Sequence, residues 1–108
     1  MQQDNKFIVS LDSGAVIVEF NEIAEQVSGY SKEEVMGKNW FNIFIPDSDL
    51  VEVLYVFNDL FYGTNITWEN INDIKCKDTQ IKTFKFENNI IKDKHGKAIS
   101  IHSVGTEL

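Results

Sequence analysis

Apolar and polar residues alternate along both ends of the chain, as they do in β-strands that bury one face. Near the start, the run Asp12-Ser13-Gly14 separates two such segments and predicts a hairpin turn. Near the end, residues 93–96 predict another turn, and residues 68–70 are interpreted as a loop or bulge before an imperfectly alternating strand. The predicted strands span residues 7–11, 15–20, 71–77, 80–91 and 97–106.

The middle of the chain carries helix start and stop signals, which lie close together between residues 21 and 46. Ser31 and Glu34 have the spacing of a capping box, in which each side chain bonds the backbone N–H of the other residue. The pattern predicts three short helices, capped by Asn21, Ser31 and Asn39 and ended by Gly29, Gly37 and Pro46. Helices this short are not stable alone in water, so they must pack against a larger apolar surface.

The longest predicted helix is capped by Asp47 or Ser48 and ends at Gly63. Apolar residues recur there at intervals of three and four and predict one buried face, with Tyr55 and Tyr62 at its border. The predicted buried positions are Leu50, Val53, Leu54, Phe57, Leu60 and Phe61.

Two strands, a group of helices and three further strands make an α+β domain. We expect a five-stranded antiparallel sheet with the short helices and the one longer helix packed on one face. A chain of 108 residues, of which 43% are hydrophobic and 12% aromatic, supplies the core of one domain. Residues 1–6 are interpreted as a ragged N-terminal end and residues 7–108 as that domain.

The net charge of the chain limits the classes of binding partner that are expected. Ten basic and 17 acidic side chains give a net charge of -7, which repels phosphate backbones and anionic lipid headgroups. Nucleic acid and membrane surfaces are therefore not expected as partners. The chain has no apolar run of membrane-spanning length and no signal-peptide pattern, so we expect a cytoplasmic location. Cys76 is the only cysteine, so no internal disulfide can form.

Several motifs, in their order and spacing, resemble those of a PAS domain of the bacterial sensory-box type. They are LDSGAVIVEFN, SGYSKEEVMGKNW, the Lys77-Asp78 pair, IIKDKHGKAISI and the closing GTEL, and the resemblance spans Phe7 to Leu108. The resemblance implies the same sheet with helices and a small cavity between the central helices and the sheet. It also implies use as a sensor or dimerisation module in a larger signalling protein.

The chain departs from the family pattern at two places. Asp78-Thr79 stands where the family usually has Asp-Gly, so the hairpin there is expected to be longer or strained. Glu107 replaces the usual final aspartate, and the chain stops one residue later. In this family that ending leads into a helical linker and an effector. We therefore expect a covalently linked effector domain beyond Leu108, of the histidine kinase or diguanylate cyclase type.

The familiar cofactors of the family are not expected. In the flavin-binding LOV branch a reactive cysteine stands in the motif that corresponds to residues 37–42, and Trp40 occupies its place here, so no flavin-thiol adduct can form. Haem-binding members commonly supply an axial histidine from the long helix, and residues 47–63 contain none. His95, His102 and Cys76 do not have the spacing of a metal site. No catalytic motif is present, so the segment is not expected to be an enzyme.

A candidate cavity remains. Its expected lining is aromatic with one or two polar groups: Trp40, Phe41, Phe44, Phe57, Phe84, Phe86, Asn88 and Ser103. Ser103 and Gly105 are placed on the inward face by the resemblance, and their small size leaves room. Alternatively, the aromatic rings simply fill the core and no ligand binds. Asn88 favours an unidentified small ligand, since a buried amide needs hydrogen-bond partners.

The sequence is compatible with three functions. The first is a signalling module that senses a small ligand or relays signals between domains. The second is a ligand-free interaction module that forms a homodimer through the outer sheet face, which contains Ile81, Thr83, Ser100, His102 and Val104. A small α+β enzyme ranks last, because no nucleophile, base and orienting group can be assigned.

Overall fold

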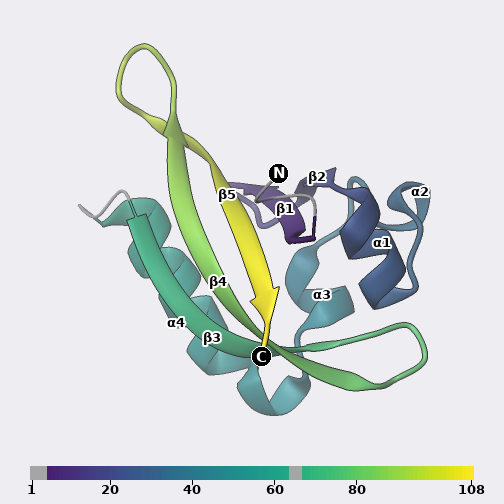
Figure 1. The fold of residues 1–108 in the computed structure, drawn as a ribbon. Helices are drawn as coiled ribbons and strands as arrows, with labels where there is room; N and C mark the ends of the chain where they lie inside the picture. The colour runs from purple at the N-terminus through teal and green to yellow at the C-terminus, as the bar shows by residue number, and fades with distance from the viewer. Residues whose placement is uncertain (1–4, 64–66) are drawn as a thin grey trace.

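The computed structural model describes residues 5–63 and 67–108. Strands and helices follow one another in the order expected from the sequence (Figure 1). They are β1 (Phe7–Asp12), β2 (Ile17–Phe20), α1 (Glu22–Ser28), α2 (Lys32–Val35), α3 (Trp40–Phe44), the 3-10 turn η1 (Asp47–Asp49), α4 (Leu50–Tyr62), β3 (Thr67–Lys75), β4 (Ile81–Lys92) and β5 (Ala98–Glu107).

The five strands form one antiparallel sheet in the order β2-β1-β5-β4-β3. The last strand therefore lies in the middle, where it pairs with β1 on one side and β4 on the other. Helices α1 to α4 cover one face of the curved sheet, with α4 running alongside β3 (Figure 1). The predicted α+β architecture is confirmed.

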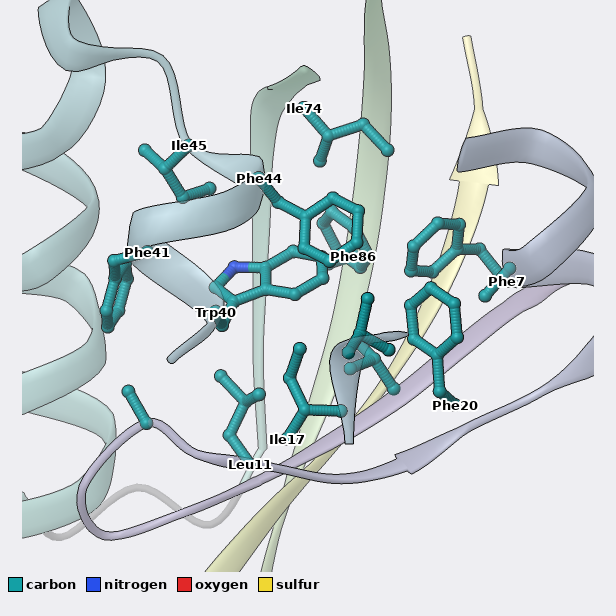
Figure 2. Close-up of a cluster of buried hydrophobic side chains, with 14 of the residues drawn as sticks. Phe7, Leu11, Ile17, Phe20, Trp40, Phe41, Phe44, Ile45, Ile74 and Phe86 are labelled. Atoms are coloured by element: carbon teal, nitrogen blue, oxygen red, sulfur yellow. The ribbon is translucent and has the colours of Figure 1, made fainter. Parts of the chain in front are cut away.

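Aromatic rings from both layers meet in the core (Figure 2). Phe7 on β1 lies at the centre of this cluster, and its ring contacts five others, mostly edge to face. Trp40 and Phe44 on α3 pack against each other with ring centroids 4.5 Å apart. Such pairs contribute about 0.5–1.5 kcal/mol each beyond the area they bury. The short helices are therefore held by the sheet, as their length required.

The predicted caps of the short helices are confirmed. Asn21 accepts a hydrogen bond from the Ala24 backbone N–H and also one from the N–H of Ile8, so it joins α1 to β1. Ser31 and Glu34 form the complete capping box of α2. The Asn39 side chain accepts from two backbone N–H groups at the start of α3.

The start of α4 differs from the prediction. Asp47 and Ser48 lie in the 3-10 turn, and within the described residues no side chain caps the first turn of α4. The buried face is also narrower than predicted, because Leu54 is 36% exposed and Tyr55 and Tyr62 are 77% and 73% exposed. Phe57 and Phe61 are buried as predicted, and the side chain of Leu60 lies outside the described part.

Strand β3 begins earlier than the sequence pattern predicts. It begins at Thr67 and pairs with β4 without a break as far as Lys75, so the predicted loop or bulge at residues 68–70 is wrong. Its inward positions are Trp68, Asn70, Asn72 and Ile74. Two polar residues among them made the alternation look imperfect.

Lys6, the last residue of the predicted ragged end, is hydrogen-bonded to the domain. Residues 1–4 of the predicted ragged end lie outside the described residues. The backbone carbonyl of Lys6 accepts a hydrogen bond from Asn21, and its ammonium group donates to Thr106.

In the part of the chain that is described, no helix combines the length and apolar character needed to cross a bilayer.

Candidate ligand-binding cavity

A cavity of about 50 Å³ lies between α3, α4 and the inward face of the sheet. Most of its wall is apolar, and α4 supplies Val53, Val56 and Phe57. The sheet and α3 supply Val9, Leu11, Trp40, Phe41, Phe86 and Ile101. The polar part of the wall consists of Asn70, Asn72, Asn88 and Ser103, all on neighbouring strands of the sheet.

Six of the eight predicted site residues line this cavity: Trp40, Phe41, Phe57, Phe86, Asn88 and Ser103. Phe41 points towards α4 (Figure 2), where its ring meets that of Phe57 at a centroid distance of 5.4 Å. Phe44 and Phe84 do not line the cavity and lie in the neighbouring aromatic core with Phe7. The rings thus divide between a cavity wall and a filled core.

The four polar residues form one hydrogen-bonded ladder across three strands. The Ser103 hydroxyl donates to Asn88 Oδ1 at 2.5 Å, and Asn88 Nδ2 donates to Asn70 Oδ1 at 2.6 Å. Asn70 Nδ2 then donates to Asn72 Oδ1, also at 2.6 Å. Asn88 Nδ2 makes a second bond, of 3.0 Å, to the backbone carbonyl of Trp68. The ladder runs from β5 through β4 to the edge strand β3.

These hydrogen bonds are important for stability because two of the polar side chains are buried. Asn88 is only 6% exposed and Ser103 only 7%, and an unpaired amide or hydroxyl there would cost about 1–3 kcal/mol. The partners expected for Asn88 are thus supplied by the protein itself. Asn70 and Asn72 are not among the site residues predicted from the sequence, although strict period-two alternation along β3 places both on the inward face.

Gly105 lies on the inward face, but it leaves no open space. A Cβ atom added there would lie 2.7 Å from Cε1 of Phe86 and 3.2 Å from Cδ2 of Phe84. The expectation that the small size of Gly105 leaves room in the cavity is therefore wrong, because two aromatic rings of β4 already occupy that room.

The cavity is small for a ligand site. A volume of about 50 Å³ holds a few water molecules, whereas pockets for small organic ligands are typically about 300–1,000 Å³. A larger ligand therefore requires one wall to move. Helix α4 forms one wall. Its first turn has no side-chain cap among the described residues, and its outer side exposes Val51 and Tyr55.

A second polar cluster lies on the outer face of the sheet. His102 Nδ1 is 3.0 Å from Ser10 Oγ and 3.0 Å from Glu19 Oε1, and the Ser10 hydroxyl donates to Glu19 at 2.6 Å. Both contacts of the imidazole use the same nitrogen. The histidine therefore does not bridge the serine and the carboxylate through its two nitrogens, as a histidine acting as a general base in a triad does.

Cys76 is buried at the end of the sheet where β3 leads into β4. Its Sγ lies 3.6 Å from the backbone carbonyl of Val27, to which the thiol donates. Burial raises the pKa of the Cys76 thiol above its usual value, and the neighbouring Lys82 ammonium only partly opposes this shift. The thiol is therefore a packing group in its protonated form, not an activated nucleophile.

The sequence matches the PAS fold family over residues 17–105. No curated protein matches the chain. Among solved structures, the PAS domain of the Cronobacter turicensis quorum-sensing receptor RpfR in complex with BDSF has 26% sequence identity and a TM-score of 0.81, over 96% of this chain and 94% of that one. The same domain in complex with C12:0 has 25% identity and a TM-score of 0.83, with the same coverage.

A more distant structure shows the same fold. The PAS-B domain of Drosophila melanogaster Cycle, with bound ethylene glycol, has 15% identity and a TM-score of 0.83, over 94% of this chain and 99% of that one. The matched segment covers most of the chain, and its sheet, short helices and cavity are those described above. The chain therefore belongs to the PAS fold family.

Proposed function

We propose that this PAS domain senses a small, largely apolar molecule that binds between α3, α4 and the sheet. The observation that carries the proposal is the Ser103-Asn88-Asn70 ladder, which places polar groups in an otherwise apolar cavity wall. Such a wall offers dispersion contacts to a hydrocarbon and directional hydrogen bonds to one polar end.

Two solved structures of a similar PAS domain, each in complex with a small molecule, support the proposal that this domain binds one. The quorum-sensing receptor PAS domains with 25% and 26% identity are in complex with C12:0 and with BDSF. Each of these alignments covers 96% of this chain. A ligand of that kind exceeds the present cavity, so its binding in this chain requires α4 to move outward. The outer side of α4 carries the exposed side chains Val51 and Tyr55, which supports α4 as the wall that moves in this proposal.

The ladder also provides a path for the signal. Ser103 lies on β5, the central strand, and its neighbours His102 and Val104 point to the opposite face of the sheet. A ligand that breaks or replaces the bond between Ser103 and Asn88 therefore acts on the strand that precedes Leu108. The proposed output is a covalently linked effector beyond Leu108, in a bacterial cytoplasmic protein of the histidine kinase or diguanylate cyclase type. Neither a flavin adduct nor haem is part of the proposal.

The proposal is tested by measuring the binding of small probe molecules to the wild-type domain and to a variant in which one wall of the cavity is altered. Octanol, octanoate and octane are titrated against the purified domain, with intrinsic fluorescence as the signal because Trp40 lines the cavity. Val53→Phe fills the cavity and should weaken binding of every probe about tenfold or more, as expected for steric exclusion. Val51→Phe is the matched control, since Val51 is on the same helix but 81% exposed. Absence of binding by all three probes would remove the proposal.

A ligand-free interaction module is the second candidate, and the small cavity volume with its internally bonded amides favours it. In that case the outer sheet face containing Ile81, Thr83, Ser100, His102 and Val104 pairs with another copy. Sedimentation of the domain over a wide concentration range tests this. A dimer that dissociates on Val104→Glu supports it, and a monomer at every concentration contradicts it.

A further inference from the structure

The cavity has a neighbour on the outside of the molecule. A groove of about 340 Å³ lies between the first half of α4 and the edge strand β3, which run side by side (Figure 1). Four residues, Val53, Val56, Asn70 and Asn72, line both the groove and the cavity. These shared side chains form part of the wall between the groove and the cavity.

We propose that ligands reach the cavity between α4 and β3, and that the site takes an uncharged molecule with a hydrogen-bond-accepting oxygen rather than a carboxylate. The ligand class is thus a medium-chain alcohol, ketone, ester or amide. This inference rests on the proposed function, because it names the chemistry of a ligand in the same cavity.

The outer groove is negatively charged. Asp49 and Glu52 line it from the α4 side. Asp73 also lines it, but its carboxylate lies on the outer face of the sheet and accepts a hydrogen bond from the Thr83 hydroxyl. No lysine, arginine or histidine is among the described residues that line the groove or the cavity. An anionic ligand would approach the carboxylates of Asp49 and Glu52 and then lose its hydration without a cation to replace it. An uncharged ligand meets neither cost.

The ladder determines which polar group fits. Asn70 Nδ2 donates one hydrogen bond, to Asn72 Oδ1, and Asn72 Nδ2 donates one at 3.3 Å to the backbone carbonyl of Asp73. An amide nitrogen carries two N–H groups, so each of these side chains has a second donor not used by a described residue. The ladder therefore ends, beside the groove, in donors that match a hydroxyl or carbonyl oxygen.

The charge preference is tested with octanol and octanoate, which share one chain length and differ in the head group. Octanol should bind at least about tenfold more tightly near neutral pH, the ratio expected from repulsion by nearby carboxylates. Equal binding, or tighter binding of octanoate, overturns the inference but leaves the proposed function intact. If neither compound nor octane binds, both proposals fail together.

Charge-neutralising variants show whether the groove causes this preference. The double variant Asp49→Asn, Glu52→Gln should strengthen octanoate binding several-fold and leave octanol binding nearly unchanged. The control removes the same charge from exposed positions on other helices, with Glu22→Gln and Glu33→Gln. An equal gain for both double variants would mean that only net charge matters, and it would overturn the role of the groove.

The access route has its own matched pair of variants. Val56→Ala shortens a side chain that separates groove and cavity, and it should raise the association rate of octanol several-fold in stopped-flow fluorescence. Val51→Ala makes the same change on the same helix at an exposed position and should leave the rate unchanged. An unchanged rate in Val56→Ala would place the route elsewhere and overturn this part of the inference.

Discussion

Thr79 holds a left-handed backbone conformation in the turn between β3 and β4. Its φ is 73°, and a hydrogen bond of 2.9 Å from its N–H to the Cys76 carbonyl closes the turn. Left-handed backbone costs about 1–2 kcal/mol for a residue with a Cβ atom, and a β-branched side chain fits it especially poorly. The strain expected from the Asp78-Thr79 pair is present at Thr79.

Thr79→Gly should therefore stabilise the domain. The expected gain is about 1 kcal/mol, because relief of the left-handed strain exceeds the extra chain entropy of glycine in the unfolded state. Equilibrium urea unfolding of the two proteins measures the difference.

Thr79→Ala is the control for this change. Alanine loses the β-branch but keeps the Cβ atom, so its stability should lie between those of the wild type and the glycine variant. Residue 79 is exposed, so no packing interaction confuses the comparison. A glycine variant that is less stable than wild type would refute the assignment of strain to this residue.

Asn88 is the residue on which the polar ladder depends. Asn88→Ala removes bonds to Ser103, Asn70 and the Trp68 carbonyl and leaves their polar groups buried without it. The expected loss is about 2–4 kcal/mol of unfolding free energy, from unpaired buried groups and a small new cavity. Thermal and urea unfolding both report this change.

The neighbouring Asn89 supplies the comparison. It lies on the same strand, points to the other face and is exposed, so Asn89→Ala should change stability by no more than about 0.5 kcal/mol. Ser103→Ala removes one bond of the ladder, and its effect should not add to that of Asn88→Ala, because the two residues share that bond. Additive effects would show that the ladder does not act as a unit.

At the scale of elements, helix caps could be predicted from the sequence because they depend on local chemistry. Asn21, Ser31 and Asn39 cap the helices assigned to them. The α4 prediction was less accurate, because periodicity identifies apolar positions but not how much of a face finds a partner. Leu54, which the periodicity places on the buried face, is 36% exposed.

Strand β3 shows why part of the site could not be predicted. Sequence patterns assign inward positions by apolarity, and Asn70 and Asn72 are inward and polar. They are accommodated there only because Asn88 comes from another strand and completes their hydrogen bonds. A pairing between residues 18 positions apart depends on strand register, which the sequence pattern alone left undetermined.

Packing between β4 and β5 gives a prediction at this scale. Gly105→Ala places a methyl group 2.7 Å from the Phe86 ring and 3.2 Å from the Phe84 ring, and both rings are buried. The expected loss is about 1–3 kcal/mol of unfolding free energy, as for other overpacked cores. Calorimetric unfolding measures it.

The control is Gly14→Ala, where the nearest atom to the new methyl group is an Asp12 carboxylate oxygen at 3.5 Å. That contact is ordinary, and the change should alter stability by less than about 1 kcal/mol. Equal effects at the two glycines would mean that the aromatic rings of β4 shift without cost.

At the scale of the whole molecule, the turn between β3 and β4 connects the sheet to the first two helices. The N–H of Lys77 donates to the carbonyl of Ser28 at 2.8 Å, and the Lys77 ammonium group pairs with Glu34 at 2.6 Å. The Cys76 thiol, in the same segment, donates to the Val27 carbonyl. Exposure of this thiol therefore requires separation of α1 from the sheet.

Stability should consequently depend on pH through Cys76. Burial raises the pKa of this thiol in the folded state, so the folded protein keeps its proton at a pH where the unfolded chain, with a thiol pKa of about 8.5, has lost it. The contribution is fully present below that unfolded pKa and is lost as pH rises through the folded pKa.

Cys76→Val has no thiol to titrate, so its stability relative to wild type should increase between about pH 7 and pH 10 in urea unfolding. Other alkaline groups cancel in this comparison, because both proteins contain them. A difference that stays constant over this range would mean that the thiol ionises as freely in the folded protein as in the unfolded chain.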